Sequence, residues 1–298
     1  MPLEHLVETL NRRFILENQL DAPPLHYDGQ RVHGRFGALR FTSTLTPVRQ
    51  HLAPAIISGH DTTPLVLIPA TADDTTRLLY GEEPPNIVSL DRLSRTVHML
   101  NYLPTSHDNG HLFVHVHPNH ILTIKQDHGA YFEEIIQRCG LSVRRIVITL
   151  GLSKTYQRHT LVLLERFKNY RDRGYSTAIT FDDLSSEDFI DLYKQYFLHR
   201  YVPDFFRFNA AFFHNTRVDK HEGWRRQALL SALRQVDTQI VLGGITNTAD
   251  AQLAEDIRPD YVQGGWYDEG LNTPCPAPPP HGEPIPIRQR QYPHPGRA

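Results

Sequence analysis

Three histidines at the end of an apolar run form the densest cluster of potential metal ligands in the sequence. His115, His117 and His120 follow the pattern H-x-H-x-x-H, and on an extended strand the first two point to the same side. Together with Asp182, their imidazole nitrogens could hold zinc or another transition ion. The chain contains 18 histidines, so clusters of this kind also arise by chance. We therefore expect no metal site, and His115 and His117 are the alternative ligands.

Two adjacent carboxylates and an aromatic pair stand directly after other apolar runs. Asp182 and Asp183 offer the oxygen ligands that hard divalent cations prefer. The same dipeptide, followed by Ser185, is also typical of a junction where a strand ends and a helix begins. Trp266 and Tyr267 could stack against a nucleic base, or they could pack at the rim of the fold. The residue types alone leave these alternatives open.

The elements that carry these residues repeat along the chain. Short apolar runs recur at intervals of roughly thirty residues, and each except the last is followed by a polar joint and a stretch with helical periodicity. A strand followed by a helix is the βαβ unit, and its repetition implies a parallel sheet. The pattern predicts an α/β protein with a (β/α)8-type, TIM-like barrel, whose chemistry sits at the carboxyl ends of the strands. The runs are Leu112–Val116, Arg145–Leu150, Thr177–Phe181, Phe205–Phe208, Gln239–Leu242 and Tyr261–Val262.

The two ends of the chain differ from this repeating part. Residues 3–20 place apolar side chains on one helical face, so we expect an N-terminal helix within residues 1–24. Asp28-Gly29, between the strand-like runs Leu25–Tyr27 and Arg31–Phe41, then predicts a hairpin at the start of the barrel, which we assign to residues 25–271. Between residues 46 and 110 only a strand candidate at Leu65–Ile68 and a helix at Ile87–Tyr102 stand out. The proline-rich tail, residues 272–298, is expected to be extended or disordered.

Composition excludes several classes of protein. A net charge of −2 and a pI near 6.8 give no global field that would attract a nucleic acid polymer. Two cysteines, Cys139 and Cys275, provide no disulfide framework and suit a reducing compartment. The N-terminus lacks the pattern of a signal peptide, and no apolar run approaches the length of a membrane span. We expect a cytoplasmic protein that does not bind membranes.

The order of the motifs resembles the EAL domain, the barrel family that hydrolyses the bacterial second messenger cyclic di-GMP. Gly34 to Arg40 is similar to the family's signature G-x-E-A-L-x-R, and Tyr261 to Trp266 is similar to Y-x-Q-G-Y-x. Between them, five further segments stand where family motifs belong. These are Leu112–Pro118 for N-L-S-P, Arg145–Leu152 for E-x-T-E, Gly174–Ser186 for D-D-F-G, Asp204–Asn209 for D-x-x-K-I-D and Ile240–Asn247 for A-E-G-V-E-T.

The resemblance also implies where this chain departs from the family. Family members use two divalent cations, which need carboxylate and carbonyl oxygens around them. The resemblance leaves Asp182, Asp183 and Gln263 as metal ligands and implies that Arg40 contacts a ligand phosphate. From their residue types and positions, Gln263 could read a guanine edge through its side-chain amide, and Trp266 could stack on a base. The other motif positions carry unsuitable side chains: Phe36, His115, Thr149, Arg207, Gly243 and Thr246.

These departures predict a degenerate EAL domain without catalytic activity and without a cofactor. We expect a regulatory protein that acts through protein–protein interaction in bacterial signalling, with an unidentified protein partner and a possible homodimer. A non-hydrolysing receptor for cyclic di-GMP is the first alternative, with Arg40, Asp182, Asp183, Gln263 and Trp266 as its ligand-binding residues. A phosphodiesterase with a repurposed metal site is the second.

Overall fold

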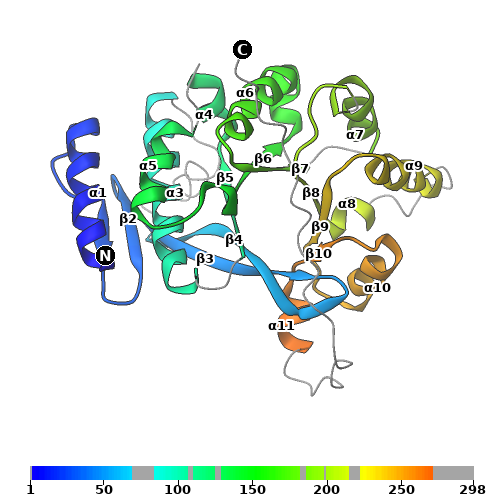
Figure 1. The fold of residues 1–298 in the computed structure, drawn as a ribbon, viewed down its shortest axis with the longest axis horizontal. Helices are drawn as coiled ribbons and strands as arrows, with labels where there is room; N and C mark the ends of the chain where they lie inside the picture. Colours follow the sequence, from blue (N-terminus) through cyan, green and yellow to red (C-terminus); the bar gives the residue numbers. More distant parts are fainter. Residues whose placement is uncertain are drawn as a thin grey trace, which may run out of the picture.

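The molecule is built around a closed ring of eight strands, with helices outside it (Figure 1). The structure, a computed structural model, describes residues 2–68, 84–106, 110–124, 129–181, 186–197, 199–214 and 222–270. Around the ring the order is β3-β10-β9-β8-β7-β6-β5-β4, and β4 pairs with β3 to close it. The predicted TIM-like barrel is therefore confirmed. One strand departs from a uniform barrel, because β3 runs antiparallel to both of its neighbours.

The strands and helices alternate through most of the chain. The strands are β1 Leu25–Tyr27, β2 Val32–Phe36, β3 Leu39–Gln50, β4 Ala53–Ile68, β5 His111–Val116, β6 Ile146–Leu152, β7 Ser176–Phe181, β8 Phe205–Asn209, β9 Gln239–Gly243 and β10 Tyr261–Val262. The helices are α1 Leu3–Asn18, α3 Pro84–Tyr102, α4 Pro118–Thr123, α5 Ala130–Arg138, α6 Thr160–Asp172, α7 Ser186–Leu192, α8 Ala210–His214, α9 Glu222–Gln235, α10 Thr248–Ile257 and α11 Gly265–Gly270. Short helical turns lie at Leu103–Thr105, Val143–Arg145, Lys154–His159 and Tyr193–Phe197. The six apolar runs coincide with β5 to β10 to within two residues at each end.

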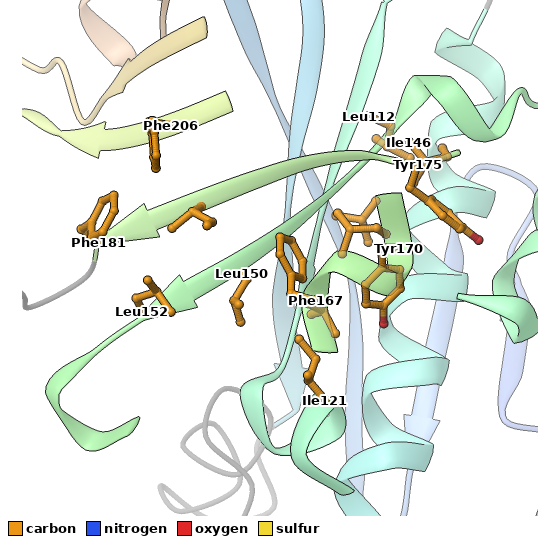
Figure 2. Close-up of a cluster of buried hydrophobic side chains, with 14 of the residues drawn as sticks. Leu112, Ile121, Ile146, Leu150, Leu152, Phe167, Tyr170, Tyr175, Phe181 and Phe206 are labelled. Carbon is orange, nitrogen blue, oxygen red and sulfur yellow. The ribbon is translucent and has the colours of Figure 1, made fainter. Parts of the chain in front are cut away.

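Two apolar layers follow from the alternation of side chains along the ring strands. One residue from each of seven ring strands points inward and fills the barrel: Val48, Phe113, Val147, Ala178, Phe205, Val241 and Tyr261. The alternate residues point outward and pack under the helices. Figure 2 shows part of this outer layer, with Leu150 of β6 near Phe167 of α6 and with Phe181 of β7 against Phe206 of β8. The interior is therefore a packed core, and any ligand must bind at an end of the barrel.

The first two ring strands form one long hairpin that the sequence pattern did not reveal. We expected a single strand over Arg31–Phe41 and another only at Leu65–Ile68, whereas β3 and β4 together run from Leu39 to Ile68. The middle of β4 is polar and contains Gly59, Asp61 and Pro64, which are residue types depleted in strands. Gly59 is required by a close approach, because a Cβ there would lie 2.5 Å from the carbonyl oxygen of His111.

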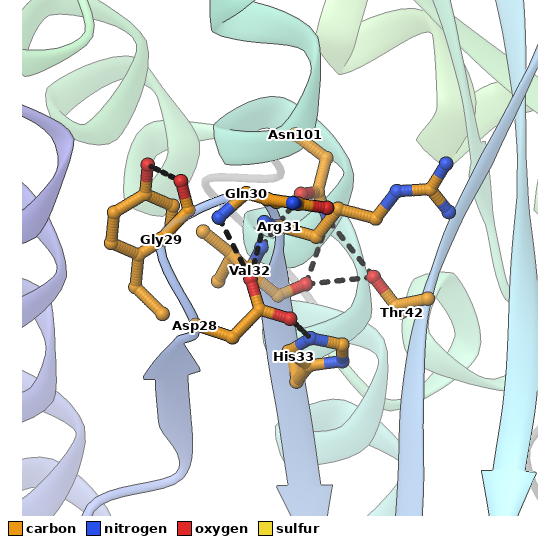
Figure 3. Close-up of polar contacts among 9 residues, drawn as sticks. Asp28, Gly29, Gln30, Arg31, Val32, His33, Thr42 and Asn101 are labelled. Carbon is orange, nitrogen blue, oxygen red and sulfur yellow. Dashed lines mark hydrogen bonds and ion pairs between the residues drawn. The ribbon is translucent and has the colours of Figure 1, made fainter.

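The remaining N-terminal elements pack beside this hairpin. The predicted helix is α1, which buries Leu6, Leu10 and Phe14. The predicted hairpin at Asp28-Gly29 joins β1 to β2, and the Asp28 carboxylate accepts hydrogen bonds from the backbone of Gln30 and Arg31 and contacts His33 (Figure 3). Asn101 of α3 holds both backbone groups of Val32. In the described part of the chain, no helix is long and apolar enough to cross a membrane.

Candidate functional site

A polar layer lies directly above the apolar filling of the barrel, at the carboxyl ends of the parallel strands. Because inward-facing positions alternate, the residue two places after each filling residue also points inward. Asp61 of β4 joins this layer, since its carboxylate contacts His115, Arg207 and Gln263. The layer consists of Asp61, His115, Thr149, Thr180, Arg207, Gly243 and Gln263. We call it the mouth layer, and it occupies the end where barrels of this type carry their chemistry.

A buried ion pair forms the centre of the mouth layer. Arg207 donates from Nη1 to Asp61 Oδ1 at 2.8 Å and from Nη2 to Asp61 Oδ2 at 2.6 Å. Both side chains are only 10% exposed. Nη2 also donates to Gln263 Oε1 at 2.9 Å, and the guanidinium carbon lies 5.0 Å from the centre of the Phe113 ring. A two-pronged arginine–carboxylate pair of this kind is among the strongest charge-assisted hydrogen-bond arrangements in proteins.

Two further groups satisfy the Asp61 carboxylate. His115 Nε2 lies 3.1 Å from Oδ1, and Gln263 Nε2 donates to Oδ2 at 3.3 Å. Burial opposes ionisation of Asp61, but the charge of Arg207 and then that of His115 outweigh it, so the pKa of Asp61 lies far below its usual range. The carboxylate is therefore ionised, and both of its oxygens are engaged. His115 is the open edge of the layer, with 43% of its side chain exposed.

The remaining positions in the layer, Thr149, Thr180 and Gly243, supply no charge. Thr149 is fully buried, and its hydroxyl has no hydrogen-bond partner among the described residues. Gly243 carries no side chain, and a Cβ there would lie 3.5 Å from Gln263 Oε1, which is an ordinary contact. Room for a larger side chain thus exists at this position, but no ligand group fills it.

The mouth layer does not fit the pair of divalent cations that the EAL resemblance implies. Two such ions need several oxygen ligands with enough negative charge to balance them. Among the residues named in the layer, only Asp61 is a carboxylate, and Arg207 already neutralises it. Within the described ranges, no group of three or more histidine, cysteine or acidic side chains could hold a metal ion.

The structure brings together only part of the ligand-binding set expected from the sequence. Gln263 lies in the mouth layer, and Trp266 follows it on α11 with 38% of its side chain exposed. Asp182 and Asp183 lie outside the described residues, as does the proline-rich tail. Arg40 is exposed on β3, opposite Arg35 of β2 and Ile68 of β4. Arg40 precedes Thr46 by six residues on β3, and Thr46 pairs with Asp61. Six residues of a strand span about 20 Å, so Arg40 lies about that far from the level of Asp61.

The position of Arg40 corrects the alignment of the signature motif. Gly34 to Arg40 span the end of β2, the turn at Gly37-Ala38 and the start of β3, and β2 is not a strand of the ring. Phe36 therefore does not replace a ligand at the mouth; it packs partly buried against the core outside the barrel. Arg40 and Asp61 are too far apart to contact the same phosphate. The carboxylate at the mouth comes instead from Asp61, which the sequence pattern did not single out.

The histidine cluster is divided between different environments. His115 belongs to the mouth layer, whereas the ring of His117 accepts a hydrogen bond from the backbone of Asn119 and caps α4. His120 is buried, and its Nδ1 lies 2.8 Å from Asp91 of α3. The described residues therefore give no support to a shared zinc site, and the arrangement that included Asp182 lies outside the described residues.

A second buried network lies outside the barrel, between α3, α4 and α6. The carboxylate of Asp91 pairs with Arg95 and His120 and accepts a hydrogen bond from the backbone of His117 at 2.9 Å. Burial disfavours its charge, yet Arg95 and His120 outweigh this, so the pKa of Asp91 lies far below its usual range. The Arg95 guanidinium stacks 3.9 Å from the centre of the Phe132 ring. We call this set the α3 network.

Comparison with known proteins identifies the fold. No family model matches the sequence, and no curated protein matches it. Solved EAL domains share the fold. Their sequence identities to this chain, 12–14% for the three described next, establish similarity of fold alone. The FimX EAL domain of Xanthomonas citri, in complex with c-diGMP, is 13% identical with a TM-score of 0.58, covering 89% of this chain and 92% of that chain. A standalone EAL protein from Vibrio cholerae O395 in its c-di-GMP-bound form gives 14% identity, a TM-score of 0.57 and coverages of 76% and 90%. Klebsiella pneumoniae BlrP1, in a calcium/cy-diGMP complex, is 12% identical with a TM-score of 0.58, and the match covers 75% of this chain and 54% of that chain.

Proposed function

We propose that this protein is a catalytically inactive EAL-like barrel that acts as a regulatory protein in bacterial cyclic di-GMP signalling. One observation carries the proposal: the single carboxylate of the mouth layer is bound on both oxygens by Arg207. The link to cyclic di-GMP rests on the solved structures with this fold, several of which contain that nucleotide.

The chemistry of phosphodiester hydrolysis supports inactivity. Two-cation hydrolysis requires ions that activate a water molecule and stabilise the developing charge on the phosphate. Asp61 has no free oxygen for an ion, and Thr149 and Gly243 contribute no charge. His115 is a nitrogen donor, which suits a transition ion better than Mg²⁺. Among the residues that the structure describes, the mouth therefore lacks the ligand set that this reaction needs.

Action through protein contacts is supported by the hydrogen bonding within the mouth layer, whose polar groups bind one another. Arg207 and Asp61 neutralise each other, and Gln263 bonds to both, so these groups offer little free charge or hydrogen bonding to a small ligand. Exposed apolar side chains lie instead at Leu52, in the turn between β3 and β4, with 85% exposure, and at Ile56 near the start of β4. Exposed apolar groups of this kind are common where proteins associate.

A hydrolysis assay tests the proposal directly. The full chain is incubated with cyclic di-GMP in Mg²⁺ or Mn²⁺ buffer, beside an active EAL phosphodiesterase, and the linear dinucleotide is quantified by chromatography. We expect no product above the buffer control. Turnover that disappears in Asp61→Asn but persists in the surface variant Leu52→Ser would overturn the assignment.

A non-hydrolysing receptor for cyclic di-GMP is the second candidate, and the exposed Trp266 beside the mouth favours it. A base stacked on an indole contributes about 1–3 kcal/mol. Isothermal titration of the wild type and Trp266→Ala with cyclic di-GMP separates the two candidates. Saturable binding that weakens by tenfold or more in Trp266→Ala would establish a receptor, whereas absence of heat supports action through protein contacts alone.

A further inference from the structure

We infer that Arg207 is a built-in cation that takes the place of the divalent ions at this barrel mouth. The inference goes beyond the proposed function, because it concerns what holds the mouth together whether or not the protein is regulatory. It predicts that the mouth keeps its structure without any divalent ion, and that it does not bind one.

The geometry of Arg207 carries the first step. Its two terminal nitrogens bond to the two oxygens of Asp61, so a metal ion could bind that carboxylate only by displacing the guanidinium. The guanidinium stays protonated at any physiological pH, and its planar fork matches a carboxylate. A covalently attached cation cannot be removed by a chelator or diluted away.

The surroundings of Arg207 carry the second step. Below it, the face of the Phe113 ring provides a favourable electrostatic contact. Beside it, Gln263 accepts from the guanidinium through Oε1 and donates to Asp61 through Nε2, which orients both charged groups. A guanidinium is more weakly hydrated than a metal ion or an ammonium group, so it suits a largely buried position.

The charge count of the layer carries the third step. Asp61 contributes one negative charge, Arg207 one positive charge, and Thr149, Thr180, Gly243 and Gln263 none, while protonation of His115 would add only further positive charge. A divalent ion added to this neutral set would leave uncompensated positive charge in a buried site, which costs several kcal/mol. Removal of Arg207 leaves a buried carboxylate with His115 and Gln263 as neighbours, a set that attracts a cation.

Divalent-ion binding tests the inference. The wild type is titrated with Mn²⁺, free Mn²⁺ is followed by electron paramagnetic resonance, and thermal unfolding is recorded in EDTA, Ca²⁺ and Mn²⁺. We expect no stoichiometric Mn²⁺ binding and the same unfolding midpoint in all three buffers. In Arg207→Ala we expect a lower midpoint, which Mn²⁺ or methylguanidinium raises by about 2–4 °C at saturation.

A matched double variant assigns the effect to the carboxylate. Arg207→Ala combined with Asp61→Asn should lose the response to both cations, while its far-ultraviolet circular dichroism stays that of the wild type. Stoichiometric Mn²⁺ binding by the wild type that Asp61→Asn abolishes would overturn the inference, and this measurement does not depend on the alanine variant folding. A folded Arg207→Ala that responds to neither cation would overturn it too.

Discussion

The mouth layer and the α3 network are two buried ion-pair clusters with similar chemistry and different surroundings. In each, one aspartate is ionised against the cost of burial because an arginine and a histidine face it. The mouth layer reaches solvent through His115, whereas the α3 network is enclosed between helices and binds the backbone of His117. The comparison indicates that a buried ion pair does not by itself mark a functional site; its position at the strand ends does.

The largest effect is expected from breaking the enclosed cluster. Asp91→Ala leaves Arg95 and His120 buried without their anion and frees the start of α4, so we expect a loss of about 4–5 kcal/mol in the free energy of unfolding. Denaturation in urea, followed by circular dichroism, measures it. A loss below about 1 kcal/mol would show that water reaches this cluster freely.

A smaller loss is expected at the mouth. Asp61→Asn removes the charge that faces Arg207, and we expect a cost of about 3 kcal/mol, because solvent near His115 can reorganise around the remaining cation. The neutral pair Asp61→Leu with Arg207→Met should recover most of that loss, since apolar replacement of a whole buried pair is often tolerated. A neutral pair less stable than Asp61→Asn would contradict this account.

Acid should destabilise the protein through the region around α3. Burial lowers the pKa of His98 to about 3, with His115 and Arg95 opposing and Asp61 and Asp91 favouring its protonation. The unfolded chain binds this proton near pH 6.5, so stability is complete above that pH and falls on acidification. The expected slope is about 1.4 kcal/mol per pH unit between pH 6 and pH 4.

The substitution His98→Gln isolates this contribution. Glutamine can keep contacts with Ser43 and Ser94, which flank the imidazole, but it does not titrate. The unfolding free energies of both proteins are measured from pH 7 to pH 4.5. Their slopes against pH should differ by about 1.4 kcal/mol per pH unit, the effect of one proton bound on unfolding. Parallel curves would place the acid sensitivity at the other two buried histidines with lowered pKa, His111 and His120.

Much of the barrel could be predicted from the sequence, because β5 to β10 are short apolar runs between helices with clear periodicity. The long hairpin could not, since β4 contains Gly59, Asp61 and Pro64, and its polar face is explained only by its place at the mouth. The local residue propensities disfavour a strand there. The strand forms because β4 is hydrogen-bonded to β3 on one side and to β5 on the other.

The candidate site was only partly predictable for the same reason. Gln263, Arg207 and His115 stand directly at the ends of recognisable strands, so their positions could be inferred. Asp61 could not, because Gly34 to Arg40 offered a closer match to the signature than the polar strand did. Residues 42–50 show no regular alternation of apolar and polar side chains, so the local sequence gave no sign of the ring strand that pairs with β4 there. The α3 network, in contrast, left a signal: Asp91 and Arg95 stand four residues apart, as an ion pair on one helical face would.

The smallest effect is expected from the exposed edge of the mouth. His115→Ala removes one contact to Asp61 while the fork from Arg207 stays in place, so stability should change by less than about 0.5 kcal/mol. The same substitution opens the route to Asp61, and if Arg207 is a sufficient cation, Mn²⁺ should still not bind. Retained stability together with new Mn²⁺ binding in His115→Ala would show that the histidine, and not Arg207 alone, excludes cations from the mouth.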